Sequence, residues 1–184
     1  MAASLESSIA KLDNRALRTA LGRFATGVCI VTTRNATNEP IGMTVNSFAS
    51  VSLEPPLILF SVARTCYSNA DWLAAEHYAV NVLSASQRPL STRFAQELSE
   101  KWAGLSPESG LADLPLLPSA LARFQCRSEH RYKGGDHVIL VGRVLAFDTP
   151  RVGDPLVFFE GRYRELADAR GAPSAHDPLW LLGW

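Results

Sequence analysis

The stretch IGMTVNSFASVSLEPPLILFSVARTCYS, residues 41–68, decides the expected fold. Short polar side chains alternate in it with apolar ones, and these residues are Thr44, Asn46, Ser47, Ser50 and Ser52 against Met43, Val45, Phe48, Val51 and Leu53. This alternation is typical of a strand with one face in water and the other against a core. Pro55 and Pro56 offer a ladder no N–H, so the strand must turn or end there, and LILFSV (57–62) is typical of a buried strand. The stretch therefore predicts a hairpin-like unit.

The polar face of this unit suits a flat heteroaromatic ring with imide-like edges, because Thr, Ser and Asn side chains form hydrogen bonds with little loss of rotamer entropy. The sequence RTCYS (64–68) follows the second strand, at the start of an expected helix, where a cation, hydroxyls and free backbone N–H groups suit a phosphate. The alternative is that the hydroxyls only face water on an antiparallel sheet, and that Thr65 or Ser68 only caps a helix. Pattern alone leaves both hypotheses open.

Composition bounds the class of protein. The 184 residues, 47% of them apolar, can bury one core, so we expect one domain or one domain plus a tail. Formal net charge is zero and no Lys/Arg stripe stands out, which excludes the electrostatic footprint of a nucleic-acid binder. No apolar run approaches the roughly 20 residues of a membrane span, and the first residues lack the features of a secretory signal. We expect a cytoplasmic protein that does not enter a membrane.

Three cysteines are widely separated, and no CxxC or His-rich spacing suggests a metal site or redox chemistry. Cys29 and Cys126 lie in strand-like runs and are expected to be small buried thiols, whereas Cys66 lies at the expected phosphate position. No metal is therefore predicted.

Taken in order, residues 1–12 are expected to be a flexible leader, followed by a helix that Asp13 or Asn14 caps and Gly27 ends, with Leu17, Leu21 and Phe24 on its apolar face. Strands are expected at residues 28–33, 77–83, 121–130, 137–147 and 155–159. Helices are expected at residues 69–74 and at residues 87–105, the second interrupted before Trp102. The second helix carries Leu90, Phe94 and Leu98 on its apolar face, with Arg93, Lys101 and Trp102 on or beyond its exposed side.

Many short strands with hairpin turns and few helices predict a mainly β protein, an antiparallel barrel with helices outside or at its ends. Residues 13–166 would form this domain. The apolar tail within 167–184, which holds two of the four tryptophans, is expected to dock on the barrel or on a second subunit.

Two further motifs could carry chemistry. In GGDH (134–137) a histidine follows a tight turn at the start of a strand, where it could orient a ligand or handle a proton; the alternative is a hairpin-end histidine bonded to Asp136. In EGRYR (160–164) Tyr163 could stack on a ring and an arginine could meet a phosphate; the alternative is a charged strand end with a packed tyrosine. No dinucleotide-binding GxGxxG, Walker loop, GxSxG elbow or HExxH helix is present, so no Rossmann domain would bind a nucleotide here.

Five segments together resemble the flavin reductase-like family, the small reductase components of two-component flavin monooxygenases. They are FATGVCIVTT (24–33), GMTVNSFASVSLEPPLILFSV (42–62), LSTRFAQ with EKWAG (90–104), GGDHVILVGRV (134–144) and PLVFFEGRYREL (155–166). The resemblance covers about residues 17–166. It implies a split β-barrel of the Greek-key, FMN-binding type with a few peripheral helices, usually a homodimer, which binds FMN or FAD and reduces it with NADH or NADPH.

The resemblance also implies roles for individual residues. The isoalloxazine would be lined by Thr44, Val45, Asn46, Ser47, Ala49 and Ser50. The ribityl phosphate would lie against Arg64, Thr65 and Cys66, with Arg93 and Phe94 closing that end, and the nicotinamide would lie by His137, flanked by Tyr163 and Arg164. Cys66 departs from the Ser or Thr often found at its position, which puts the choice of FMN or FAD and the tightness of binding in question.

The resemblance implies hydride transfer from NAD(P)H to flavin N5, with His137 positioning the nicotinamide and the reduced flavin leaving for a separate oxygenase. One alternative is a flavoprotein that keeps its flavin and reduces another acceptor, such as a corrinoid or a quinone. Another is a module that binds flavin for storage or sensing without turnover.

Overall fold

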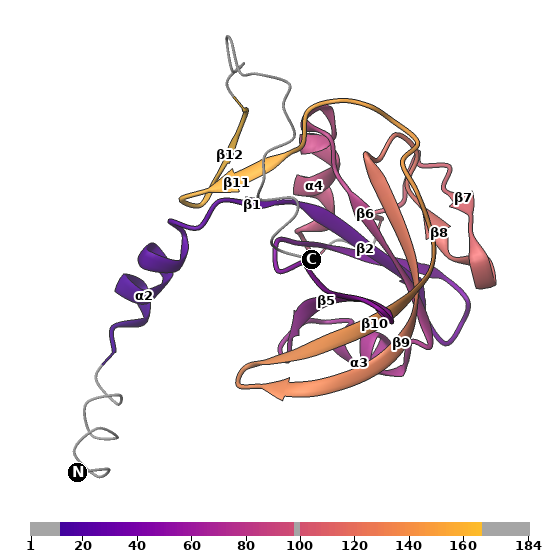
Figure 1. Ribbon diagram of the computed structural model, residues 1–184, viewed down its shortest axis with the longest axis horizontal. Coiled ribbons are helices and arrows are strands. Elements are labelled where there is room, and N and C mark those ends of the chain that lie inside the picture. The colour runs from indigo at the N-terminus through magenta and orange to yellow at the C-terminus, as the bar shows by residue number, and fades with distance from the viewer. Residues whose placement is uncertain (1–11, 98–99, 167–184) are drawn as a thin grey trace.

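A computed structural model describes residues 12–97 and 100–166 of the chain (Figure 1). A seven-stranded sheet dominates it, and each neighbouring pair of strands is antiparallel. In spatial order the strands are β3 (Pro40–Val45), β2 (Cys29–Arg34), β6 (His77–Val82), β9 (Ala122–Gly134), β10 (His137–Asp148), β5 (Pro56–Ala63) and β4 (Ala49–Leu53).

The connection between β3 and β4 explains why this sheet curls. These strands lie at the two opposite edges of the sheet, yet only residues 46–48 join them. Four residue steps span at most about 14 Å, so the two edges must approach each other although they are not paired. The predicted mainly β, split-barrel fold is confirmed. Residues 41–53 are not one strand, however, because the chain crosses from one sheet edge to the other within them.

Smaller elements surround the barrel. The short strands are β1 (Thr26–Gly27), β11 (Val157–Phe159) and β12 (Arg162–Arg164), which form one small sheet, and β7 (Glu108–Ser109) and β8 (Pro115–Leu116), which form another. The helices are α2 (Asn14–Leu21), α3 (Asn69–Ala74) and α4 (Arg88–Phe94), with 3-10 turns η1 (Ala85–Gln87) and η2 (Leu111–Asp113). None of the helices in the described ranges is long and apolar enough to cross a membrane.

The core follows from the strand patterns. Buried and half-buried residues alternate along most of β5, as expected for a strand with one face in the core. Inside the barrel the ring of Phe60 meets Trp72 and Tyr78 edge to face, at centroid distances of 5.9 and 5.1 Å. All three side chains are fully buried. These contacts pack α3 against β5 and β6.

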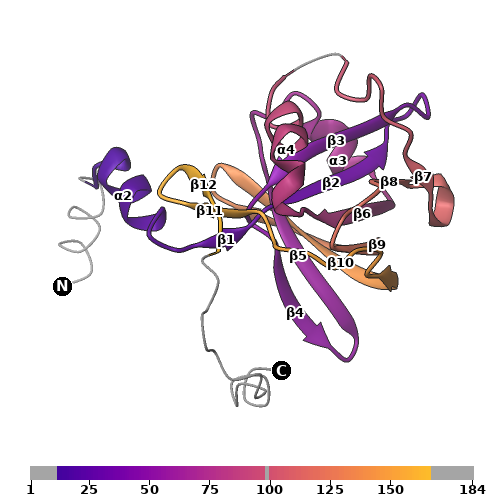
Figure 2. The same cartoon turned by 90° about the horizontal axis from the view of Figure 1, so that it is seen from above.

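The first predicted helix is shorter than expected. Asp13 caps it as predicted, since its carboxylate accepts a hydrogen bond from the N–H of Arg15 at 2.9 Å. The helix ends at Leu21 and not near Gly27, because the carbonyl of Gly22 accepts from the N–H of Glu160 and turns the chain into β1. In Figures 1 and 2 α2 stands apart from the barrel, and its Leu17 and Leu21 are exposed, as is Phe24 beyond its end, to 78%.

The helix predicted over residues 87–105, with an interruption before Trp102, is present at its start but ends earlier than expected. The α-helical part ends at Phe94, and the carbonyl of Phe94 accepts a hydrogen bond from the Nζ atom of Lys101 at 3.2 Å. A continuing helix would satisfy that carbonyl from within. Leu98, expected on its apolar face, lies outside the described residues, as do the leader (1–11) and the tail (167–184).

The later strands differ from their predicted limits only at the ends. The strand predicted at 121–130 continues to Gly134, and β10 begins at His137 as expected. Between them Gly135 has a φ of 70°, the left-handed conformation that glycine adopts without strain. The strand predicted at 155–159 begins at Val157.

Candidate functional site

A cavity of about 690 Å³ lies where the end of β3, the end of β5, the end of α4 and the start of β10 meet. Eight of the residues predicted from the sequence line it: Thr44, Val45, Asn46, Ser47, Thr65, Cys66, Phe94 and His137. The crossing at residues 46–48 brings the end of β3 next to β5. Most of these residues therefore meet because the sheet curls.

Hydrogen bonds fix the wall that β3 and the crossing form. The hydroxyl of Thr44 donates to the carbonyl of Ser91 in α4 at 2.7 Å. The hydroxyl of Ser47 accepts from the N–H of Ser61 in β5 at 3.0 Å. Asn46 and Thr65 are exposed at the cavity. The wall is thus held rigidly and still presents neutral polar groups to a ligand.

His137 lines the cavity at the start of β10. It pairs with Ala63 of β5 and with Gly134 across the hairpin, which fixes its backbone. Its Nδ1 atom lies 2.7 Å from the carboxylate of Asp136, and this hydrogen bond holds the pKa of Asp136 below its usual value. The half-exposed ring therefore keeps Nε2 for a ligand, as both predicted roles of this histidine require.

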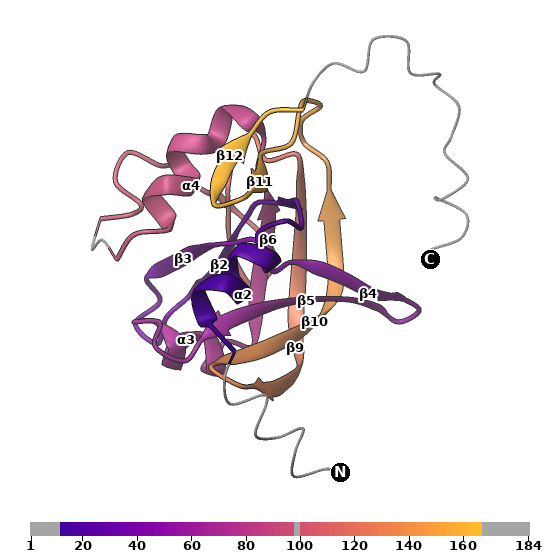
Figure 3. The same ribbon diagram turned by 90° about the vertical axis from the view of Figure 1, so that its left-hand side faces the viewer.

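Six predicted residues do not line the cavity. Ala49 and Ser50 are exposed on β4, which projects from the body with part of β5 as an arm (Figures 2 and 3). Arg64 is exposed, and Arg93 donates from Nη1 to the carbonyl of Ala103 at 3.0 Å.

The remaining two are in β12. The hydroxyl of Tyr163 forms a 2.8 Å hydrogen bond with the buried hydroxyl of Ser91, and the guanidinium of Arg88 lies 5.3 Å from its ring centroid. Tyr163 thus reaches the wall only through Ser91, whose carbonyl accepts from Thr44. Arg164 is exposed at the end of the strand.

Nine further residues line the cavity that the sequence did not predict there. They are Met43, Ser61, Ala63, Ala95, Gln96, Glu97, Lys101, Gly134 and Ile139. The period of β5 could have identified two of them, because Ser61 and Ala63 share a face of that strand.

Lys101 was expected at or beyond an exposed helix face and instead lines the cavity. Its Nζ atom donates to the carbonyls of Phe94 and Gly42, at 3.2 and 3.4 Å, and burial lowers its pKa. Phe94 itself is buried, and the ring of Trp102 meets it edge to face at 5.0 Å. A Cβ atom at Gly42 would lie 2.7 Å from the Phe94 ring, so this glycine is required for the close approach of β3 and α4.

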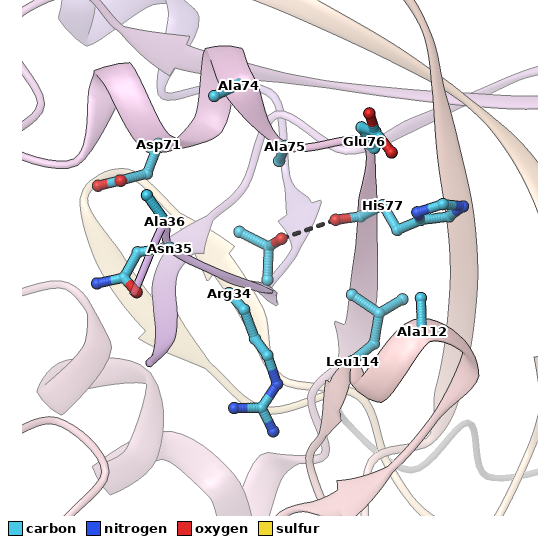
Figure 4. A pocket seen from close by; sticks show the side chains of 11 residues that line it. Arg34, Asn35, Ala36, Asp71, Ala74, Ala75, Glu76, His77, Ala112 and Leu114 are labelled. Atoms are coloured by element: carbon cyan, nitrogen blue, oxygen red, sulfur yellow. Dashed lines mark hydrogen bonds between the residues drawn. The ribbon is translucent and has the colours of Figure 1, made fainter. Parts of the chain in front are cut away.

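A second, smaller hollow of about 270 Å³ lies between the β2–β3 turn, α3 and the start of β6 (Figure 4). We call it the groove. The hydroxyl of Thr33 donates to the carbonyl of His77 at 2.7 Å, and Arg34 donates from Nε to the carbonyl of Asp113 at 2.7 Å and from Nη1 to that of Asn38 at 2.8 Å. None of the predicted site residues lines this groove.

Known proteins resemble this chain over most of its length. The family model described as flavin reductase like domain matches residues 21–167. The FMN reductase (NADH) SmoA of Agrobacterium fabrum is 45% identical over 82% of this chain and 85% of its own. A probable flavin reductase of Rhizobium meliloti is 42% identical over 74% of this chain, which spans only 44% of that protein's length.

A solved structure shows the same fold. The NADH:FAD oxidoreductase SgcE6 of Streptomyces globisporus, in complex with NAD and FAD fragments, superposes with a TM-score of 0.80 and 35% sequence identity. The match covers 85% of this chain and 94% of SgcE6.

The residues of the cavity fit a flavin. Its volume is within the roughly 300–1,000 Å³ of small-molecule sites. Its lining combines apolar surface with short neutral hydrogen-bonding groups, a histidine, the Lys101 ammonium and the carboxylate of Glu97. Such a lining suits a planar ring with polar edges that ends in an anion.

Proposed function

This chain belongs to the flavin reductase-like domain family, and we propose that it is an NAD(P)H-dependent flavin reductase that supplies reduced FMN or FAD to a separate monooxygenase. The observation that carries the proposal is the cavity of about 690 Å³ beside the β3–β4 crossing, lined by neutral polar side chains and His137. The groove instead presents the carboxylates of Asp71 and Glu76, which would repel an anionic ligand.

Within the cavity the chain would hold the flavin ring by its own hydrogen-bonding groups. Asn46 and Ser47 lie at the crossing and Thr65 at the end of β5, so polar edges of one flat ring can be met from two sides. The flavin supplies the redox chemistry by accepting a hydride and passing electrons on. The protein's contribution is orientation and a wall that excludes water, which Thr44 and Ser47 keep in place through their bonds to α4 and β5.

His137 would orient the nicotinamide. Asp136 fixes its ring through Nδ1, so Nε2 is the nitrogen that would meet the carboxamide. Replacing His137 with Ala is expected to raise the KM for NADH and lower turnover, while the affinity for flavin stays unchanged. Full turnover with an unchanged KM in H137A would rule out this role.

We propose that residues 13–166 form a single flavin-binding domain and that the active protein is a homodimer. The β4–β5 arm is exposed on both faces and carries Val51 and Leu53, and β10 exposes Leu145 and Phe147, the last to 71%. Isolated apolar side chains are normal at a protein surface. An arm whose apolar side chains are exposed on both faces favours their burial against a second subunit. Sedimentation of the purified protein over a range of concentrations tests this, and a monomer at all of them would contradict it.

The deciding experiment is steady-state oxidation of NADH and of NADPH by the purified protein, with and without added FMN, FAD or riboflavin. Oxidation that rises with free flavin is the expected result, and it ranks the flavins and the nucleotides together. The use of NAD(P)H makes the cytoplasm the expected location. Turnover that needs a second acceptor and not free flavin would indicate a protein that keeps its flavin. Tight flavin binding without any turnover would overturn the proposal in favour of storage or sensing.

A further inference from the structure

The cation at the anionic end of the flavin is the open question of this site. Arg64 and Arg93 were expected at the phosphate from the sequence, and neither lines the cavity. Among the described residues, Lys101 is the one Lys or Arg side chain that does. Within the described residues, an anionic group of the ligand therefore has one amine cation, Lys101, to meet in this cavity.

Two rigid elements hold the Lys101 ammonium in place. It donates to the carbonyl of Gly42 in β3 at 3.4 Å and to the carbonyl of Phe94 at the end of α4 at 3.2 Å. An ammonium group has three N–H donors. Two long hydrogen bonds to main-chain oxygens leave one donor for the cavity, and the group is already positioned when a ligand arrives.

The surroundings of Lys101 would otherwise repel an anion. The last carbonyls of α4 carry the negative end of its dipole, and the carboxylate of Glu97 and the thiol of Cys66 are the titratable groups that face the ammonium. Burial lowers the pKa of Lys101, which means that the charged form lacks full compensation in the free protein. A phosphate beside it would provide that compensation.

We propose that Lys101 binds the phosphate of FMN or the corresponding pyrophosphate of FAD, in place of Arg64 and Arg93. This inference rests on the proposed function, since it assumes that the cavity takes a flavin. It adds that Lys101 acts on the anionic end and not on the ring. Glu97 lies on the same side and weakens the binding of that end.

The test compares FMN with riboflavin, which has the same ring and no phosphate. Dissociation constants are measured by quenching of flavin fluorescence, without NADH, for wild type, Lys101→Met, Lys101→Arg and the matched control Lys133→Met, an exposed lysine on β9. Lys101→Met is expected to weaken FMN by about tenfold or more, as for loss of a hydrogen bond to a charged group, and to leave riboflavin unchanged. Lys101→Arg is expected to recover part of the FMN affinity, and Lys133→Met to change neither flavin.

Glu97→Gln gives the opposite sign. It removes the competing carboxylate and is expected to tighten FMN by roughly twofold, the size of an exposed charge interaction, without affecting riboflavin. Thermal unfolding of each variant shows whether the fold is retained.

Each other outcome overturns the inference. Equal weakening of both flavins by Lys101→Met would mean that Lys101 only fastens α4 to β3, and no weakening of either would mean that it does not meet the ligand. A wild-type protein that binds FMN no better than riboflavin would also contradict it, while leaving the flavin reductase proposal intact. A wild-type protein that binds no flavin would overturn both.

Discussion

The cavity and the groove are both lined by polar side chains, but they differ in where their hydrogen bonds go. In the groove, Thr33 and Arg34 donate to main-chain carbonyls of the protein itself. Its other polar groups include the carboxylates of Asp71 and Glu76, which Figure 4 shows around the hollow. At the cavity, Asn46 and Thr65 are exposed, and Lys101 retains a donor. The open carboxylates of the groove would repel an anionic ligand, whereas the cavity offers neutral polar groups and the Lys101 ammonium, with Glu97 as its one carboxylate among the described residues.

Side chains near the groove have a structural task that explains this difference. The hydroxyl of Thr32 donates to the carbonyl of Pro115, and the amide oxygen of Asn81 accepts from the N–H of Leu117. With the bond from Arg34 to Asp113, they fasten the segment that contains β8 over β2 and β6. The groove lies beside this attached segment, so substitutions in the groove should lower the stability of the fold without changing the affinity for flavin.

The largest expected loss of stability comes from truncating one buried side chain at the cavity and one at the groove. Phe94→Ala removes a fully buried ring at the cavity and should destabilise the protein by about 3–5 kcal/mol. Leu114→Ala at the groove should cost about 2–5 kcal/mol. Urea unfolding measures both. Only Phe94→Ala should also lower the affinity for flavin. A loss of flavin affinity in L114A, measured under conditions where L114A is folded, would contradict the distinction between the two regions.

Filling the two hollows should have a smaller and more selective effect. Ala63 lines the cavity on β5, and Ala74 lines the groove at the end of α3. Ala63→Trp should weaken flavin by roughly 10- to 100-fold, the equivalent of typical overpacking costs, because the ring and the new side chain compete for space. Ala74→Trp should leave flavin binding unchanged. The affinities are measured by titration, and equal effects would show that flavin binds elsewhere.

Two threonines allow a closer match. Thr44→Val removes the hydrogen bond to Ser91 at the cavity, and Thr33→Val removes the one to His77 at the groove, each 2.7 Å long. Each variant should lose about 1 kcal/mol of stability in urea unfolding. Thr44→Val should in addition weaken flavin, since Thr44 lines the cavity and ties β3 to α4. If Thr33→Val lowered flavin affinity more than Thr44→Val, the groove and not the cavity would be the flavin site.

Most of the barrel could be predicted from the sequence because its strands carry local signals. The run at 137–147 is β-branched and follows a Gly-Gly turn, and β10 begins and nearly ends where expected. The helix predicted over 87–105 ends earlier than expected because its end is set by Lys101, which reaches back to a carbonyl that no local pattern identifies. The division of residues 41–53 between two sheet edges is likewise a property of the closed sheet and not of the segment.

The candidate site divides in the same way. Residues of the central stretch and His137 could be identified because each lies in a recognisable motif, the stretch 42–62 or GGDH (134–137), that carries the family resemblance. Lys101 could not, since its helical spacing indicates an exposed face and only the end of α4 brings it into the cavity. Arg93 was placed at the phosphate although its side chain bonds the carbonyl of Ala103. Charge alone, read from sequence, does not say which cation faces the ligand.

The smallest expected effect concerns acid pH, where one carboxylate on each side has a lowered pKa. Beside the cavity, the hydrogen bond that the Asp136 carboxylate accepts from Nδ1 of His137 lowers the pKa of Asp136. In the second region, hydrogen bonds from the buried Arg123, which also binds Glu108 of β7, lower the pKa of Asp148. A depressed carboxylate pKa stabilises the fold above the unfolded value of about 3.9, and this contribution is lost as pH falls through the folded pKa.

Asp148→Asn should therefore flatten the fall in stability between about pH 5 and pH 3, which urea midpoints across that range would measure. Because Asp148 is 43% exposed, we expect less than about 1 kcal/mol. Asp136→Asn should flatten the same curve and, unlike Asp148→Asn, also raise the KM for NADH at pH 7, because it frees the ring of His137. An unchanged KM for NADH in D136N would show that the hydrogen bond to His137 does not matter for nicotinamide binding. A raised KM for NADH in D148N would show that the two regions are coupled through β10, the strand that carries both His137 and Asp148.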